Sequence, residues 1–193
     1  MSGLPAIKKT WTPAEYLAWE RLQPDKHEFH GGEVFDMAGA TFEHNQIVIN
    51  VGAELRALLR QKPCRVCASD LRVKIPATGL YTYPDASVVC GRPEFEDDKL
   101  DTLLNPLILI EVLSDSTADY DRGTKFTIYR TIASLQDYVL ISTDKILVEY
   151  YTRKEDGSWV LREFKAGERF NLESIECELA VDELYLKVFD VQS

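Results

Sequence analysis

The stretch Leu107-Ile108-Leu109-Ile110-Glu111-Val112-Leu113 decides the fold class of this chain. A run this apolar predicts a β-strand buried on both faces, as in sheets that helices cover on either side. Glu111 interrupts the run, and an ionised carboxylate in such a strand needs a charge partner, a metal ion or a raised pKa. The stretch therefore indicates a functional site as well as an inner strand.

A second acid, Asp85, stands at the start of another apolar run. It closes Tyr83-Pro84-Asp85 and leads into Ala86-Ser87-Val88-Val89-Cys90, which also predicts an inner strand. The acidic connection at 91–105 is long enough to join two neighbouring strands. We therefore expect Asp85 and Glu111 on adjacent strands.

The other predicted elements surround these two strands. Helical spacing and capping residues predict helices at 12–20, 43–61 and 114–132. Further strands are predicted at 64–75 and 138–141, a turn at 76–83, and hairpins at 27–37 and 146–164. This order predicts a three-layer α/β core, a mixed sheet flanked by helices, with an added N-terminal hairpin and an added C-terminal hairpin. The length of 193 residues suits a single domain, 1–193.

Charge and hydropathy limit the class of protein. The net charge of −10 argues against a protein that coats nucleic acid through bulk electrostatics. One segment is nevertheless basic, since a single acid, Asp70, accompanies Arg56, Arg60, Lys62, Arg65, Arg72 and Lys74. No apolar stretch approaches the ~18 residues of a membrane span, and residues 1–10 lack the apolar core of a signal peptide. We therefore expect a cytoplasmic protein with no membrane association.

The cysteines allow two interpretations. Cys64 and Cys67 have the spacing of a zinc or redox pair, but no second pair follows. Residues three apart in a strand point to opposite faces, which disfavours a shared metal. Reduced thiols are the leading expectation for all four cysteines, and a structural zinc site is the minor alternative.

Two carboxylates on adjacent strands suit a divalent metal site for phosphodiester hydrolysis. Magnesium prefers oxygen ligands, commonly one or two carboxylates with waters. Asp85 and Glu111 would supply carboxylate oxygens, and Val112 would add its backbone carbonyl. Lys125 is the candidate for orienting the attacking water or stabilising developing charge. On spacing alone, an exposed Asp121–Lys125 pair at i, i+4 is an equal alternative for that lysine.

The same residues carry a family resemblance. Pro84-Asp85, followed by Glu111 within an apolar strand, resembles the PD-(D/E)xK nuclease superfamily. The fuller string resembles the bacterial Uma-two family of restriction-endonuclease-like proteins: Glu111-Val112-Leu113-Ser114-Asp115-Ser116-Thr117, then Asp121-Arg122-Gly123-Thr124-Lys125 and Tyr129. The segment His27-Glu28-Phe29-His30-Gly31-Gly32-Glu33-Val34 and a histidine opening the long helix, His44, fit the same family.

The resemblance implies a restriction-endonuclease-like core and a metal-dependent endonuclease that uses Mg²⁺, or alternatively Mn²⁺, on DNA. The E-x-K motif of the superfamily would place a lysine at position 113, where this chain has Leu113. The resemblance to the Uma-two family implies that the catalytic lysine lies instead on the following helix, at Lys125. It also implies that Glu28 reaches the metal from the N-terminal hairpin, and that the protein forms a homodimer. For His44 two interpretations stay open: a histidine at the start of a helix is more often structural, and the alternative is that it touches phosphate or donates to Asp85 or Glu28.

Other functions stay open at this point. A catalytically silent nucleic-acid or protein-binding module on the same fold would explain the acidic net charge and the displaced lysine. A third interpretation is a carboxylate-pair hydrolase, such as a glycosidase, that needs no metal. Outside the candidate site, Asp70 is expected to pair with Arg72 or Arg65, and Tyr129 is expected to belong to the core.

Overall fold

A six-stranded mixed sheet forms the centre of the computed structural model, which describes residues 10–37, 39–114 and 118–189. Its strand order is β11-β10-β9-β8-β6-β3. Only β8 and β9 pair in parallel, and the other neighbours are antiparallel. The bounds are β3 Cys64–Ala68, β6 Ala86–Cys90, β8 Ile108–Leu113, β9 Asp137–Ser142, β10 Leu147–Arg153 and β11 Trp159–Lys165.

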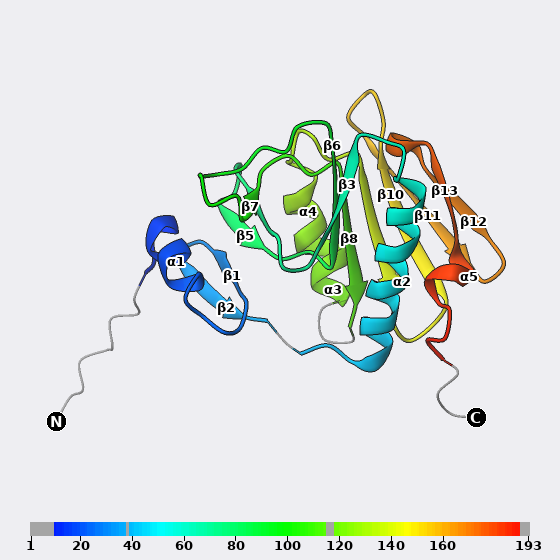
Figure 1. The fold of residues 1–193 in the computed structure, drawn as a ribbon, viewed down its shortest axis with the longest axis horizontal. Helices are drawn as coiled ribbons and strands as arrows, with labels where there is room; N and C mark the ends of the chain where they lie inside the picture. The colour runs from blue at the N-terminus through cyan, green and yellow to red at the C-terminus, as the bar shows by residue number, and fades with distance from the viewer. Residues whose placement is uncertain (1–9, 38, 115–117, 190–193) are drawn as a thin grey trace.

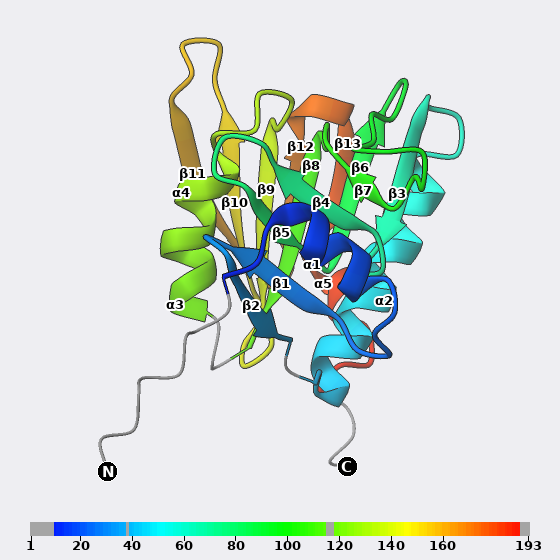
Figure 2. The ribbon, with the colours of Figure 1, turned by 90° about the vertical axis from the view of Figure 1, so that its left-hand side faces the viewer.

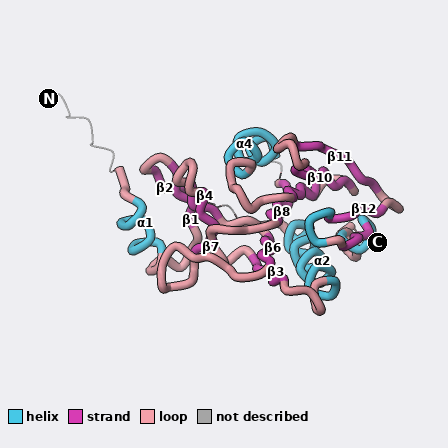
Figure 3. The backbone as a smooth tube through the Cα atoms, turned by 90° about the horizontal axis from the view of Figure 1, so that it is seen from above, coloured by secondary structure: helices cyan, strands magenta, loops and turns pink. Residues whose placement is uncertain are grey.

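Helices cover both faces of this sheet, as Figure 3 shows from above. The long helix α2 (Phe42–Leu58) packs Ile47, Val51 and Leu55 against the face that carries Ile108 and Ile110. On the opposite face lie three short helical segments, α3 Ala118–Tyr120, η1 Asp121–Lys125 and α4 Phe126–Tyr129. The predicted three-layer core is confirmed.

A second, five-stranded sheet lies beside the first, with the order β2-β1-β5-β4-β7. Helix α1 (Pro13–Glu20) packs on it and is capped by Thr12 and Glu15, which form a complete capping box. Figures 1 and 2 show α1 and the β1–β2 hairpin together at one side of the molecule. The strand bounds are β1 His27–His30, β2 Glu33–Asp36, β4 Arg72–Ile75, β5 Leu80–Thr82 and β7 Thr102–Leu103. Strand β1 of this sheet carries Glu28, one of the predicted site residues.

The C-terminal part completes the layer on the α2 side. Strands β12 (Arg169–Leu172) and β13 (Cys177–Ala180) pair with each other, with the short helix η2 (Glu173–Ile175) between them. Helix α5 (Val181–Leu184) then packs beside α2, where Asn50 donates hydrogen bonds to the Leu184 and Leu186 carbonyls. Both predicted hairpins are present, as β1–β2 and β10–β11. No helix in the described ranges is long and apolar enough to cross a membrane.

Three predictions about the region 64–103 were wrong. The single strand predicted at 64–75 is two strands, β3 and β4, which belong to different sheets and are separated by a turn. The segment 76–83, predicted as a turn, contains β5, and the connection 91–105 contains β7. The partial register of the apolar residues in 64–75 reflects the change of sheet, because each half presents its apolar side chains to a different core.

The predicted helix at 114–132 is shorter and irregular. Its first residues, 115–117, lie outside the described part of the chain. Between α3 and α4 one wide turn, Asp121–Lys125, has π-helical hydrogen bonding, with the Phe126 amide donating to the Asp121 carbonyl. Such π-bulges occur frequently at functional sites because they re-aim side chains.

The expectation of reduced thiols was wrong for Cys64 and Cys90 and is confirmed for Cys67 and Cys177. Cys64 and Cys90 form a disulfide between directly paired positions of β3 and β6. Cys67 and Cys177 are free. Cys64 is therefore neither a reduced thiol nor a partner of Cys67 in a zinc site.

Candidate active site

Asp85 and Glu111 lie at the same end of the central sheet. The antiparallel register pairs Ala86 with Ile110, so one step further along the two strands Asp85 lies opposite Glu111. Glu111 shares its face of β8 with Leu109 and Leu113, which pack against the helices α3 to α4. Because the pairing is antiparallel, the start of β6 meets the end of β8, and the two acids meet there.

Asp85 is held in place through both carboxylate oxygens. Its Oδ2 accepts a hydrogen bond of 2.7 Å from the Val112 amide, and its Oδ1 lies 3.2 Å from His44 Nε2. His44 is in the first turn of α2, where Thr41 caps the helix by accepting from the His44 amide. The prediction that His44 serves Asp85 is thus met by the geometry. The side chains of Asp85 and His44 are each about one-fifth exposed.

Glu111 is buried, with 4% of its surface exposed. Its Oε1 accepts a hydrogen bond of 2.7 Å from the Tyr129 hydroxyl and lies 3.0 Å from Lys125 Nζ. Burial raises the Glu111 pKa to about 8, and the nearby charges of Asp85 and Asp121 act in the same direction. The Lys125 ammonium opposes this shift but does not cancel it.

Lys125 lies at the centre of a ring of carboxylates. Its Nζ is 3.0 Å from Glu111, 3.3 Å from Asp121 and 3.5 Å from Glu28. Burial works against the charged form, but these carboxylates outweigh it and raise the Lys125 pKa well above its usual value. The lysine is 7% exposed. The Asp121–Lys125 pair is therefore a buried part of the cluster rather than the exposed surface pair of the alternative interpretation.

Glu28 joins the cluster from the second sheet. It lies on β1, and its Oε1 accepts a hydrogen bond from the Thr82 hydroxyl of β5. Thr82 in turn lies 3.4 Å from the Tyr129 hydroxyl, which donates to Glu111. Of the predicted site residues, Glu111 and Glu28 thus both contact Lys125, and Asp85 joins them through the Val112 amide, next to Glu111 in β8.

Sequence reasoning missed two members of this cluster. Asp121 was considered only as a surface partner of Lys125, but it is 3% exposed, and its Oδ1 accepts no hydrogen bond although it lies within ion-pair distance of Lys125. Tyr129 belongs to the core as predicted, but it also donates to Glu111. The four-residue spacing of Asp121, Lys125 and Tyr129 was the available signal, since it places all three on one helix face.

The charges in this cluster do not balance. Three carboxylates (Glu111, Glu28 and Asp121) share one lysine, and Asp85 beside them has His44 as its basic contact among the described residues. A divalent cation at Asp85 and Glu111 would offset the excess negative charge. No group of three or more His, Cys, Asp or Glu side chains in the described ranges is arranged as a complete metal cage. The donor set fits Mg²⁺, which keeps waters alongside one or two carboxylates.

Two remaining expectations concern residues beside the cluster. Val112 was predicted to offer its carbonyl to a metal, and the structure shows its amide bound to Asp85, which places this backbone segment at the site. Asp70 does not pair with Arg72 or Arg65 as expected, because it lies 3.1 Å from Lys26. Arg72 instead donates to Tyr83 and Thr102. Asp70 is therefore not part of the site.

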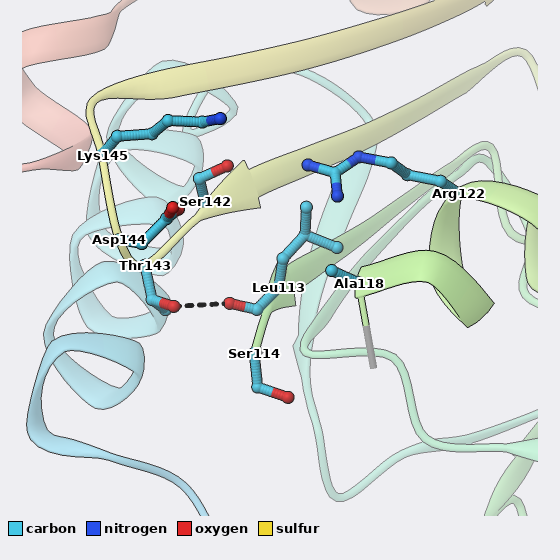
Figure 4. A pocket seen from close by; sticks show the side chains of 8 residues that line it. All are labelled: Leu113, Ser114, Ala118, Arg122, Ser142, Thr143, Asp144 and Lys145. Carbon is cyan, nitrogen blue, oxygen red and sulfur yellow. Dashed lines mark hydrogen bonds between the residues drawn. The ribbon is translucent and has the colours of Figure 1, made fainter. Parts of the chain in front are cut away.

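A polar cavity of about 200 Å³ opens at the carboxyl ends of β8 and β9. Figure 4 shows Arg122 reaching toward it from the π-turn, and the Thr143 hydroxyl donating to the Leu113 carbonyl. Arg122 is neutralised by Glu149, with its Nη2 2.6 Å from the carboxylate. The lining residues are Leu113, Ser114, Ala118, Arg122, Ser142, Thr143, Asp144 and Lys145. The cavity lies at the same sheet end as Glu111.

Comparison with known proteins is consistent with this arrangement. A family model named Uma2 and described as "Putative restriction endonuclease" matches residues 13–184. This chain belongs to the Uma2 family. Two uncharacterized proteins of the cyanobacterium Synechocystis, slr1290 and sll1609, are 36% and 37% identical to it over 174 and 168 residues. These alignments cover 90% and 87% of this chain, and 90% and 94% of the relatives.

A solved structure extends the comparison to the fold. A crystal structure from Anabaena variabilis, described as "a putative nuclease belonging to DUF820", superposes with a TM-score of 0.70 at 19% identity. The superposition covers 89% of this Uma2 chain and 96% of the other chain. At this identity the likeness establishes the fold and leaves the chemistry to the site itself. The predicted restriction-endonuclease-like fold is confirmed.

Proposed function

We propose that this Uma2 protein is a magnesium-dependent endonuclease that hydrolyses phosphodiester bonds in DNA. The observation that carries the proposal is the cluster in which Glu111, Glu28 and Asp121 surround the single ammonium of Lys125, with Asp85 opposite Glu111 on the neighbouring strand. Such an arrangement does not serve the stability of the fold, since burying carboxylates in place of apolar side chains costs free energy. The family description and the fold of the Anabaena nuclease support the same class of reaction.

Asp85 and Glu111 are the proposed metal ligands, with the Val112 carbonyl as a third oxygen donor. Bound Mg²⁺ would shield the phosphate charge and lower the pKa of an attacking water. Mn²⁺ accepts the same oxygen donors and is the expected substitute. In this role His44 and the Val112 amide keep the Asp85 carboxylate oriented.

Lys125 is the proposed catalytic lysine. The π-turn directs its amine at Glu111, so it would hold the attacking water beside the metal or stabilise the charge that develops on the phosphate. Glu28 and Asp121 keep the amine protonated and restrict its position. We assign Glu28 to the catalytic group because it is the one member supplied by the second sheet.

Plasmid DNA with Mg²⁺ tests the proposal. Wild-type protein is expected to nick or linearise the plasmid, and EDTA is expected to stop the reaction. Asp85→Asn and Glu111→Gln are expected to lose activity by about a hundredfold or more, as expected when a metal ligand of a hydrolase is removed. The exposed acids Asp98 and Glu163 supply matched controls, Asp98→Asn and Glu163→Gln, which should cleave normally. Cleavage that persists in both ligand variants would remove the assignment.

A catalytically silent binding module is the second candidate. The supporting observation is that Leu113 occupies the position of the usual motif lysine, so that the lysine beside Glu111 comes from a separate helical segment. Calorimetry separates the two functions, because only the nuclease requires Mg²⁺ or Mn²⁺ binding that Asp85→Asn abolishes. DNA binding without any metal binding would favour the silent module.

A further inference from the structure

A second cavity lies on the other face of the sheet, between helix α2 and the edge strand β3. It has a volume of about 190 Å³ and is mostly apolar, with Val48, Val66 and Ala86 among its lining residues. One end is formed by Asp85, the proposed metal ligand, and another part by Arg56. Figures 1 and 3 both place α2 beside β3. The cavity therefore connects the candidate metal site with a basic side chain.

Gly52 makes this groove possible. It sits in the middle of α2, four residues from both Val48 and Arg56, so these three residues form one row along the helix. A Cβ built on Gly52 would meet no atom within 4 Å, which shows that the space above it is open. Glycine in a helix interior destabilises the helix relative to alanine, so Gly52 does not stabilise α2. Its effect is to leave open space beside the helix.

The charges along the groove suit an anion. Arg56 on α2 and Arg60 in the turn that follows it are exposed, and among the residues that the structure describes no carboxylate lies within ion-pair distance of either. Glu54 belongs to the row of Asn50, which faces α5 instead.

We infer that this groove binds one unpaired nucleotide of the substrate strand, with its base on the apolar floor around Gly52 and its phosphate at Arg56. The inference rests on the proposed nuclease function, since Asp85 marks the end at which the strand is cut. The cavity is smaller than the ~300–1,000 Å³ of sites for drug-sized ligands, so it suits a single base rather than a larger group. A duplex keeps its bases stacked inside, whereas a single strand can turn one onto a protein surface.

The distance along the helix agrees with this path. From His44, which contacts Asp85, to Arg56 the helix rises by about 18 Å at ~1.5 Å per residue. A strand that leaves the metal site along α2 therefore meets an apolar floor first and unpaired arginines afterwards. The inference assigns a preference for single-stranded or frayed nucleic acid, which the family description does not specify.

Fluorescence anisotropy with a labelled single-stranded oligodeoxynucleotide, in EDTA so that no hydrolysis occurs, tests the inference. Gly52→Leu fills the groove and is expected to weaken binding about five- to tenfold, the lower end of the range for losing one base contact. Gly52→Ala should have a smaller effect in the same direction. Ala53→Leu, the exposed neighbouring position, is the matched control and should bind like wild type. Circular dichroism should show full helix content in all three variants, because each replaces a residue with a good helix former or keeps one.

The role of Arg56 is tested through salt dependence. Arg56→Gln should weaken single-strand binding and reduce the slope of log K against log salt by about 0.7, the value for one phosphate contact on a single strand. Lys165→Gln, which removes an exposed charge on β11, should leave that slope unchanged. Equal loss of single-strand and duplex binding in Gly52→Leu, or no loss in either, would overturn the inference.

The same experiment keeps the two proposals apart. Binding that depends on Gly52 and Arg56 without any plasmid cleavage would preserve the groove and refute the nuclease function. Mg²⁺-dependent cleavage of a single-stranded substrate that Gly52→Leu does not slow would preserve the nuclease function and refute the groove.

Discussion

Replacing Glu111 by glutamine should stabilise the metal-free protein at alkaline pH. Glu111 is buried, and burial raises its pKa to about 8, whereas an unfolded glutamate titrates near 4.3. Between these two values the folded protein holds a proton that the unfolded chain releases. The free energy of unfolding of the wild type therefore falls as the pH rises through this window. Glutamine occupies the same space and carries no such penalty.

The magnitude follows from the linkage relation. Each pH unit in the window changes the free energy of unfolding by about 1.36 kcal/mol for one bound proton. Between about pH 5.5 and pH 7.5, the stability of Glu111→Gln should therefore rise by up to ~2.7 kcal/mol relative to wild type. For a chain of this size that corresponds to roughly 5–10 °C in the melting temperature. Below about pH 4 both forms are protonated and the pH-dependent difference disappears.

Thermal and urea unfolding in EDTA, across this pH range, measure the effect. The three histidines are present in both proteins, so their titration cancels in the difference. Glu163→Gln, on the exposed face of β11, controls for the loss of one negative charge. Added Mg²⁺ should restore wild-type stability at pH 7.5 and should leave Glu111→Gln unchanged. A difference between wild type and Glu111→Gln that stays constant with pH would refute the argument that Glu111 is a buried, under-compensated carboxylate.

Three further predictions concern neighbouring groups. Calorimetry at pH 7 in buffers of different ionisation enthalpy should show that Mg²⁺ binding releases a proton, because the metal displaces it from Glu111; equal heats in all buffers would contradict this. Lys125→Met should retain Mg²⁺ binding and lose plasmid cleavage by about 10²–10³-fold, the cost of removing one charge-stabilising donor, and wild-type cleavage rates would exclude its catalytic role. Removing the disulfide with Cys90→Ser should cost about 2–4 kcal/mol in urea unfolding under oxidising conditions and nothing under reducing ones.

The core and two of the acids could be predicted from the sequence because each has a local signal. The run around Glu111 and the one after Asp85 are apolar on both faces, which only an inner strand explains. The antiparallel register that brings these acids together follows from placing both runs in one sheet. The position of Lys125 came from the family resemblance and not from spacing, since spacing alone fits an exposed ion pair equally well.

The second sheet could not be predicted because its strands are short and their partners distant. Strand β5 has three residues and β7 has two, and each forms only through pairing with β4 and, for β5, also with β1. The burial of Asp121 could not be predicted for a similar reason, since it depends on segments distant in the chain. Its side chain is enclosed only once a π-turn and the Glu28 hairpin close over Lys125, and neither leaves a local pattern.

The proximity of Cys64 and Cys90 depends on pairing between β3 and β6. Before the register is known, spacing alone groups Cys64 with Cys67, three residues away in the chain, as a zinc or redox pair. Once Cys64 is paired directly with Cys90, the interpretation changes from metal or free thiols to a cross-strand link. Long-range register was the information that the sequence reasoning lacked.

A crystal soaked in Mn²⁺ and measured at a wavelength that reveals the manganese signal tests the central claim most directly. We expect one ion that is coordinated by Asp85 and Glu111 at about 2.0–2.2 Å, as for oxygen ligands of a small divalent cation, with the Lys125 amine moved away from Glu111 but still at the site. Crystals of Asp85→Asn should lose the signal. Wild-type crystals without an ion at these carboxylates, and with Lys125 still paired to Glu111, would contradict the claim that this cluster is a metal site.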